Sequence, residues 1–588
     1  MKKPASSPVQ KPRDTKGTIL RLLRTMTHDR TLFALALALT VAGNLLALAG
    51  PKLAGEAIDA IGPDAILWPV ILRKCALMLV CYASSALLSY GLSLLMIHIS
   101  RGVVYRMREA AFDRLMRLPV RFFDEHPSGD IISRISYDIE TVNESLSNDI
   151  VQILSTVVTV AGSLFFMATI SPRLLLVFCV TVPLSLYLGR RRATVTKPLF
   201  RARSRKLGEL NSFVEEQLSG LTTLRAYCRE DAALERFDGI NEEAVQAYYE
   251  SEYEGSVIGP LVNFINNLSL AMVSAFGALL FCAGQMSIGS ISSFILYSRR
   301  FSGPINEAAN VFAELQSALA AAERVFSLID EPAEPEDAPD ARALCEPRGH
   351  VELENVTFGY DPDQPILKNF CVDAQSGRLI AVVGPTGAGK TTLISLLMRF
   401  YDAQSGRICV DEGEISGYTM RSLRAAYAMV LQETWLFEGT VYDNLRYANA
   451  HATREQVIAA AKAAHADSFI RRLPNGYDTV LTDDGANISK GQKQLLTIAR
   501  AMLLDSRMVI LDEATSNVDT RIEKQSQQAM RRLMAGKTCF VIAHRLSTIE
   551  SADEILVVNH GEIVERGTHS QLMQAKGFYY TMYRAQFE

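Results

Sequence analysis

A glycine-rich segment that carries one lysine and one threonine offers the first recognisable chemistry in the sequence. Residues 384–391 read GPTGAGKT and fit the spacing G-x-x-x-x-G-K-[ST]. An apolar run at 379–383 precedes the segment, and a helical pattern at 392–400 follows it. Glycines let backbone N–H groups wrap phosphates at the start of a helix. We therefore expect Lys390 to reach the β- and γ-phosphates of a nucleotide and Thr391 to ligate Mg²⁺.

Two adjacent carboxylates follow a second apolar run. Residues 508–513 read MVILDE, which predicts a buried strand that ends in Asp512 and Glu513. Asp512 suits Mg²⁺ binding, directly or through water, and Glu513 suits a general base that polarises the attacking water. An acidic pair at a surface strand end is the plain alternative. Because a phosphate loop lies upstream in the same chain, we favour a role for the two carboxylates in nucleotide hydrolysis.

A third segment, 488–494, reads ISKGQKQ and precedes a helical pattern. Its serine hydroxyl and the backbone N–H groups at the helix start can bind anions. The phosphate loop alone gives this segment no role within its own chain. The nine cysteines form no CxxC pair and no Cys/His cluster with zinc spacing. We therefore interpret them as small apolar residues and not as metal ligands.

The chemistry-bearing segments all lie in the second half, whereas the first half holds long uncharged stretches. The chain has 588 residues, of which 48% are hydrophobic and 21% are charged. A membrane helix needs ~20 apolar residues, and the middle of the longest stretch (GQMSIGS) is typical of a turn, so we predict six spans. Buried helices of a large soluble protein are the alternative, against which the number of stretches argues. The uncharged stretches are 31–50, 75–100, 151–171, 174–189 and 255–298.

Among the segments that flank the uncharged stretches, lysine and arginine residues are concentrated in three, 1–30, 101–134 and 190–236. By the positive-inside rule these segments are cytosolic, which predicts a multi-pass protein of the cell membrane with both termini in the cytoplasm. The first segment lacks an A-x-A-like cleavage site and is not expected to be a cleaved signal. The two cytosolic loops read as helical, with turns expected at 122–130 (FFDEHPSGD) and near 224–230.

The composition changes after residue 330. Residues 331–349 are rich in proline, alanine and acidic residues and are typical of a linker. Strands and helices alternate beyond it, which predicts an α/β domain.

The net charge of −4 gives no indication of nucleic-acid binding. We predict an N-terminal cytosolic segment (1–30), an all-α six-helix transmembrane domain (31–328), a linker (329–349) and an α/β P-loop ATPase domain (350–588).

In their order along the chain the motifs resemble those of an ATP-binding cassette (ABC) transporter half of the exporter type. The resemblance covers the chain from about residue 17 to 588. It implies that Tyr360 stacks on adenine, that Gln432 senses Mg²⁺ and contacts the membrane domain, and that His544 is the switch histidine at the γ-phosphate. With Glu513, Gln432 and His544 form the implied catalytic set, and Thr391, Gln432 and Asp512 the implied Mg²⁺ set.

The resemblance also assigns the remaining motif residues. Ser516 and Asp519 lie in the implied D-loop. The implied ATP-binding residues are Tyr360, Gly384, Pro385, Thr386, Gly387, Ala388, Gly389, Lys390, Thr391 and Thr392. The implied signature residues, which would contact ATP bound by a partner chain, are Ser489, Lys490, Gly491 and Gln492.

In the family, two ATPase domains close head to tail around two ATP molecules, so the resemblance implies a second half-transporter as partner. The turns at 122–130 and 224–230 resemble the coupling helices that dock on the ATPase domains. One departure is the signature, where Lys490 replaces the first glycine of LSGGQ; residues 482–485 likewise replace G-E-x-G. An altered signature beside an intact Glu513 resembles one half of heterodimeric exporters. This implies a different partner chain, whose signature would be intact; a homodimer that tolerates Lys490 is the alternative.

The resemblance therefore implies an ATP-driven efflux transporter, a translocase for a hydrophobic or amphipathic drug, lipid or peptide, with multidrug export as the default. ATP and Mg²⁺ are the implied ligands, and the lipid bilayer is the implied surroundings. A siderophore-type importer on the exporter fold and a non-transport, ATP-gated membrane module are the alternatives. Arg299, Arg300 and Glu307, after the last uncharged stretch, are candidates both for a substrate cavity and for a structural role.

Overall fold

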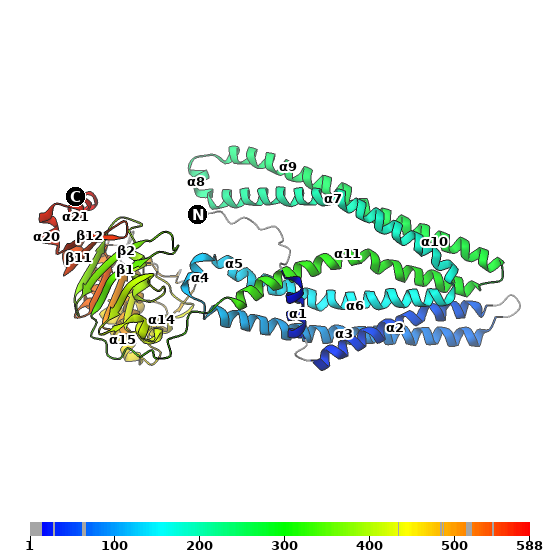
Figure 1. Ribbon diagram of the computed structural model, residues 1–588, viewed down its shortest axis with the longest axis horizontal. Coiled ribbons are helices and arrows are strands. Elements are labelled where there is room, and N and C mark those ends of the chain that lie inside the picture. The colour runs from blue at the N-terminus through cyan, green and yellow to red at the C-terminus, as the bar shows by residue number, and fades with distance from the viewer. Residues whose placement is uncertain are drawn as a thin grey trace. The chain divides into compact units, whose positions relative to one another are not determined.

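The computed structural model describes residues 14–26, 30–61, 66–432, 434–482, 485, 487–512, 520–543 and 546–587. The chain divides into two compact units (Figure 1). The first unit comprises Met1–Leu118 and His126–Pro332. The second comprises Ala333–Glu588 together with Pro119–Glu125, a short piece of the chain that interrupts the first unit.

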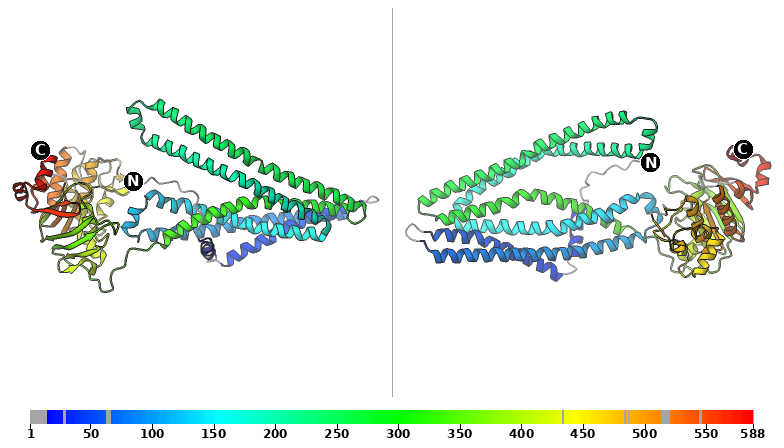
Figure 2. Two further views of the ribbon diagram at one scale, coloured as in Figure 1. Left: turned by 45° about the horizontal axis from the view of Figure 1, so that its top comes forward. Right: turned by 180° about the vertical axis from the view of Figure 1, so that it is seen from behind.

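Long helices make up the first unit (Figures 1 and 2). Its helices are α1 (Thr15–Met26), α2 (Arg30–Asp59), α3 (Trp68–Leu115), α5 (Ser128–Ser133), the π-helical turn η2 (Arg134–Asp138), α6 (Ile139–Ile170), α7 (Pro172–Ser219), α8 (Leu221–Ala226), α9 (Glu230–Ser256), α10 (Ile258–Cys282) and α11 (Ile288–Asp330). Figure 2 shows α7 running beside α9 and α10, a pairing that closes at α8. The helical class predicted for this part of the chain is confirmed.

Within the described part of the chain, five helical stretches are long and apolar enough to cross a membrane. They are α2, α3, Ser128–Ile170, α7 and Glu230–Cys282. The sixth predicted span falls on α11, where Arg299 and Arg300 follow the apolar first turns. Six spans therefore stay a prediction, with five supported by length and composition.

The breaks between helices have identifiable causes. Pro127 has extended backbone angles (φ −61°, ψ 138°) and separates α5 from the helix before it, as expected for the turn at 122–130. In the second loop, α7 ends at Ser219 with Gly220 as its C-cap, and Cys228 with φ +50° precedes α9. The second turn lies where it was expected, although its opening glycine lies upstream of the predicted range.

An ion pair with one buried partner joins α11 to the π-helical turn η2 in the first unit. Arg324 of α11 donates from Nε and Nη2 to the two carboxylate oxygens of Asp138, at 2.8 and 2.6 Å. Asp138 is 6% exposed and ends the π-helical turn η2. A bidentate pair of this kind orients both partners, so it fixes α11 against the start of α6.

Two main sheets form the second unit. One is antiparallel, in the order β2-β1-β4-β5, and the other has the order β12-β11-β3-β10-β9-β6, in which the strands from β11 to β6 are parallel. The strands of these sheets are β1 (Val351–Phe358), β2 (Leu367–Ala374), β3 (Leu379–Val383), β4 (Ser405–Val410), β5 (Gly413–Glu414), β6 (Tyr427–Val430), β9 (Met508–Asp512), β10 (Thr538–Ile542), β11 (Glu554–Asn559) and β12 (Glu562–Gly567).

Helices cover the parallel strands, which are apolar along their length because both faces are buried. The helices of this unit are α4 (Val120–Glu125), α12 (Lys390–Leu397), α13 (Met420–Ala425), α14 (Val441–Arg446), α15 (Arg454–Ala463), α16 (Asp467–Ile470), α17 (Lys490–Leu503), α18 (Thr520–Met534), α19 (Leu546–Glu550), α20 (His569–Ala575) and α21 (Phe578–Phe587). A short pair, β7 (Gly439–Thr440) and β8 (Val480–Leu481), completes it. The predicted α/β class is confirmed.

The predicted linker is bound to the second unit along much of its length. Glu334 accepts two hydrogen bonds from Arg424, at 3.2 and 2.6 Å. Further along, the Arg342 backbone N–H donates to Gly417 O at 2.9 Å, and the Leu344 N–H donates to Ser422 Oγ at 2.9 Å. Polar and backbone contacts hold this segment in place. The composition indicated only a linker because such contacts need no apolar residues.

Candidate nucleotide-binding site

The parallel sheet brings the predicted motif residues to one edge. The glycine-rich loop follows β3, Asp512 ends β9, and Gln432 follows β6. Strand β10 lies between β3 and β9, and the chain leaves it just before position 544. Because these strands are parallel, their carboxyl ends lie at the same edge, where ligands of open α/β sheets bind.

Close backbone approach explains the glycines of the loop. Gly389 has φ +102°, and a Cβ atom there would lie 2.7 Å from Leu367 Cδ2. At Gly384 a Cβ atom would lie 2.1 Å from the carbonyl oxygen of Val558. Larger residues would therefore displace the loop from β2 and β11, and with it the N–H groups at the start of α12.

Lys390 folds back over this loop. Its Nζ donates to Gly384 O at 2.7 Å and to Pro385 O at 2.9 Å. Burial lowers the pKa of Lys390, and the nearby Asp512 carboxylate acts in the opposite direction. The ammonium group thus lies at the mouth of the loop with Asp512 close to it. A phosphate oxygen placed there can accept hydrogen bonds from it.

The loop residues fit a magnesium nucleotide. Thr391 is exposed at the second position of α12, and Asp512 is half-buried at the end of β9. A hydroxyl and a carboxylate are hard oxygen ligands of the kind that Mg²⁺ takes together with water and phosphate. The side chain of Thr392 is only 5% exposed, so its backbone N–H group is the part that could contribute to the loop. Gln432 is exposed.

Tyr360 presents an aromatic face next to the loop's sheet. It follows β1, is 42% exposed, and packs edge-on against Phe358, with ring centroids 5.3 Å apart. Tyr401 packs edge-on against Tyr360 at 5.1 Å. An exposed aromatic ring of this kind can stack on a planar base.

The signature residues start α17. Ser489 is the N-cap, where its Oγ accepts from Gln492 N at 3.3 Å while Gln492 Oε1 accepts from Ser489 N at 2.9 Å. Lys490 is the exposed first residue of the helix, and Gly491 is buried. A helical residue needs no positive φ, so the backbone accepts lysine at position 490.

Four predicted residues lie outside the described part of the chain. They are Glu513, Ser516, Asp519 and His544. Asp483 and Asp484, upstream of the signature, also lie outside it.

Arg500 is a residue that sequence reasoning left without a role. From α17 it donates through Nε to Asn444 O at 2.9 Å and through Nη1 to Trp435 O at 3.1 Å. The guanidinium lies 5.4 Å from the ring of Tyr447 and 6.0 Å from that of Phe437, two rings that stack on each other, and burial lowers the pKa of Arg500. Arg500 therefore holds the segment after Gln432 against the signature helix. In the sequence, a single arginine within the apolar stretch of α17 was the signal that could have indicated a structural role for Arg500.

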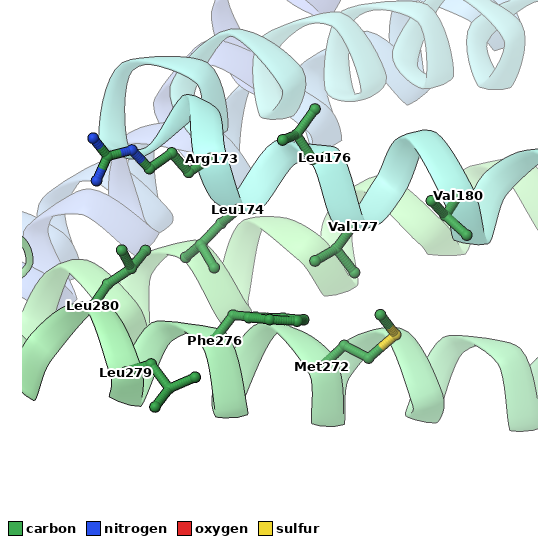
Figure 3. A pocket seen from close by; sticks show the side chains of 9 residues that line it. All are labelled: Arg173, Leu174, Leu176, Val177, Val180, Met272, Phe276, Leu279 and Leu280. Carbon is green, nitrogen blue, oxygen red and sulfur yellow. The ribbon is translucent and has the colours of Figure 1, made fainter.

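The first unit contains an apolar groove of about 340 Å³ between α7 and α10 (Figure 3). Figure 3 shows Val177 of α7 facing Phe276 and Met272 of α10, and Arg173 at the end where α7 begins. The Arg173 guanidinium hydrogen-bonds Gln285. The groove combines an aliphatic wall with one cation, which suits an amphipathic molecule.

Comparisons with known proteins agree with this architecture. A family model described as ABC transporter transmembrane region matches residues 33–305, and one described as ABC transporter matches residues 367–516. The chain is 42% identical to the uncharacterized ABC transporter ATP-binding protein YfiC of Bacillus subtilis (strain 168), over 100% of this chain and 97% of YfiC.

A second relative and a solved structure extend the likeness. A fatty acid ABC transporter ATP-binding/permease protein of Mycobacterium tuberculosis (strain CDC 1551 / Oshkosh) is 38% identical over 98% of both chains. A bacterial Atm1-family ABC exporter with ATP bound aligns with a TM-score of 0.76 and 29% identity, over 95% of this chain and 98% of that chain. The chain therefore belongs to the ABC transporter family, as an exporter-type half-transporter in which a helical transmembrane domain is fused to an ATPase domain.

Proposed function

We propose that this protein is one subunit of an ATP-driven exporter that moves a hydrophobic or amphipathic molecule out of the cytoplasm. The observation that carries the proposal is the phosphate loop with Lys390 over it, on the same chain as five helices of membrane length. We place the subunit in the cell membrane with both termini in the cytoplasm, because the basic segments border the spans on that side.

The ATP-binding roles follow from position. We propose that Tyr360 stacks on adenine and that residues Gly384 to Thr392 hold the phosphates, with Lys390 at the β- and γ-phosphates. Thr391, Asp512 and Gln432 would hold Mg²⁺, which neutralises phosphate charge in such reactions. Glu513 would orient and deprotonate the attacking water, and His544 would contact the γ-phosphate.

We propose that the working assembly has two half-transporters, each lending its signature to ATP held by the other. The exposed start of α17 supports this, because Ser489 and Lys490 face outward from their own unit. ATP held by both faces binds the closed form more tightly and shifts the conformational equilibrium toward it. Hydrolysis then removes the γ-phosphate and resets the equilibrium.

The partner is proposed to be a different chain, because Lys490 replaces a signature glycine while Glu513 is present. Native mass spectrometry of the complex, purified from its source membrane through a tag on this chain, tests the composition. Two subunits of different mass are expected. A complex that contains this chain alone would establish the homodimer instead.

For the substrate we propose an amphipathic, lipid-like molecule. The groove beside Arg173 supports this class, and so does the kinship with a protein whose name is a fatty acid ABC transporter. The test is transport into inside-out membrane vesicles, with a radiolabelled long-chain fatty acid and a hydrophobic cationic dye as probes. ATP-dependent accumulation of the fatty acid is expected, and the variant Glu513→Gln should abolish it.

The same assay distinguishes the alternatives. Accumulation of the dye but not of the fatty acid would favour multidrug export. An importer would accumulate its substrate in right-side-out vesicles loaded with ATP. A probe flux that persists unchanged in Glu513→Gln would indicate an ATP-gated module instead of a pump.

A further inference from the structure

Tyr401 contacts both Tyr360, the proposed adenine-stacking residue, and the short helix α4. It follows the phosphate-loop helix α12, in the sequence RFYD. Its ring packs edge-on against Tyr360, with centroids 5.1 Å apart and planes at 83°, and it also contacts Phe358 at 5.4 Å. Its hydroxyl donates a hydrogen bond to Asp124 Oδ2 in α4. One side chain therefore touches both Tyr360 and α4.

Helix α4 belongs to the second unit, which includes Pro119–Glu125. Its Phe122 is only 4% exposed. Arg121 donates from Nε to Glu125 Oε1 at 2.7 Å along the exposed side of the helix. The chain enters α4 directly after α3, a helix of membrane length, and leaves it toward α5 and α6. Helix α4 is therefore connected through the chain to helices on both sides of it.

The hydroxyl of Tyr401 stays a donor over the whole physiological range. Burial and the hydrogen bond to the Asp124 carboxylate both raise the pKa of Tyr401 above its ordinary value. A hydrogen bond to a charged acceptor is stronger than one between neutral groups and more directional than ring packing. The bond to Asp124 therefore orients the ring that supports Tyr360.

We propose that Tyr401 is a positioning residue that couples the stacking of a nucleotide base on Tyr360 to the position of α4. The inference rests on the proposed role of Tyr360 in ATP binding. If base stacking orders Tyr360, it also orders Tyr401 and its bond to Asp124, and by reciprocity an ordered α4 favours base binding. The coupling concerns the base and not the phosphates, because Tyr401 contacts Tyr360 and makes no hydrogen bond to the phosphate loop among those the structure describes.

The experiment compares two ligands that differ in the base. Full-length complex carrying Glu513→Gln, which prevents hydrolysis, is reconstituted in nanodiscs. Hydrogen exchange of the α4 amides (Val120–Glu125) is followed by mass spectrometry with saturating Mg-ATP and with saturating magnesium tripolyphosphate, which has no base. With Tyr401 present, ATP is expected to slow exchange in α4 at least about threefold more than tripolyphosphate does.

Two variants test the hydrogen bond itself. Tyr401→Phe keeps the ring but loses the hydroxyl, and Asp124→Ala loses the acceptor; each should remove the difference between the two ligands while ATP affinity changes less than about twofold. Asp124→Asn keeps an acceptor and should restore most of the difference. Tyr418→Phe is the matched control, because Tyr418 donates to Val410 O at 3.1 Å within the same unit, and it should behave as the parent.

The outcomes separate the inference from the function on which it rests. Equal protection of α4 by ATP in Tyr401→Phe and in the parent would overturn the role of Tyr401. Equal affinity for ATP and tripolyphosphate in the parent would overturn the proposed stacking on Tyr360, and the coupling with it. If Tyr401→Phe fails to fold, the Asp124→Ala and Asp124→Asn pair decides the question alone.

Discussion

The phosphate loop and the signature segment lie in the same unit but are built in opposite ways. The loop is embedded, with Gly384 against the Val558 carbonyl and Lys390 held by two carbonyl groups of the loop itself. The signature segment is exposed, and its Ser489 and Gln492 side chains are used to cap their own helix. The first is built to hold phosphates with the backbone of its own unit. The second is an exposed surface that a ligand held by another chain could reach, which agrees with the dimer implied by the family.

The largest effect is expected from removing the proposed base beside the embedded phosphate loop. Glu513→Gln keeps the shape of the side chain but removes the base, so ATP hydrolysis should fall by more than about tenfold while ATP binding is retained. Steady-state phosphate release and equilibrium binding of a fluorescent ATP analogue measure the two quantities. Near-normal turnover would refute the role of Glu513.

A smaller effect is expected on binding alone. Lys390→Ala removes a charged donor from the loop, and ATP affinity should fall by about tenfold or more, the usual worth of a hydrogen bond to a charged group. Equilibrium binding to the complex at low protein concentration measures it. Lys390→Arg, which retains the charge, is the comparison variant. Unchanged affinity in Lys390→Ala would contradict the phosphate contact.

The embedding of the loop can be tested through stability. Gly389→Ala forces a Cβ atom against Leu367 at φ +102°, and should cost about 1–3 kcal/mol in the ATPase unit. Gly377→Ala is the control, since its φ is also positive (+80°) but open space surrounds it, and it should cost less. Thermal unfolding of the purified complex gives the ranking. Equal midpoints would show that the contact with β2 does not hold the loop.

The smallest effect is expected on the exposed side. Lys490→Gly restores the family's glycine at an exposed helix start and should change stability by less than about 1 kcal/mol. If the partner chain lacks the catalytic glutamate, the ATP that Lys490 contacts is held by that chain and is not hydrolysed, so ATP turnover should change less than about twofold. A large rise in turnover, measured on the same complex by phosphate release, would instead indicate that Lys490 faces a hydrolysing site.

The sequence was sufficient for the parts of the fold that depend on local pattern. Uncharged runs predicted the membrane-length helices, and the glycine spacing before Lys390 predicted a loop between β3 and α12, because both signals lie in consecutive residues. Contacts between distant residues were beyond reach. The hydrogen bond of Tyr401 to Asp124 and the docking of Arg500 on Asn444 join segments far apart in the chain. No spacing rule identifies such partners from one sequence.

The six-span prediction illustrates a different limit. The apolar run at the start of α11 is cut short by Arg299 and Arg300, so hydropathy alone does not decide whether this helix crosses the membrane. The π-helical turn at Arg134–Asp138 is similar, since no local pattern indicated it; its last residue, Asp138, pairs with the distant Arg324.

The bound linker also determines where the ATPase domain can be cut for expression. Arg424 holds Glu334 and also donates to the carbonyl groups of Met398 and Arg399, the residues that follow the phosphate-loop helix. A fragment that starts at residue 350, where the first strand begins, would strip the carboxylate from Arg424 and weaken support for that helix end. A fragment that starts at Ala333 keeps this pair. The useful boundary is therefore set by the salt bridge and not by the first strand.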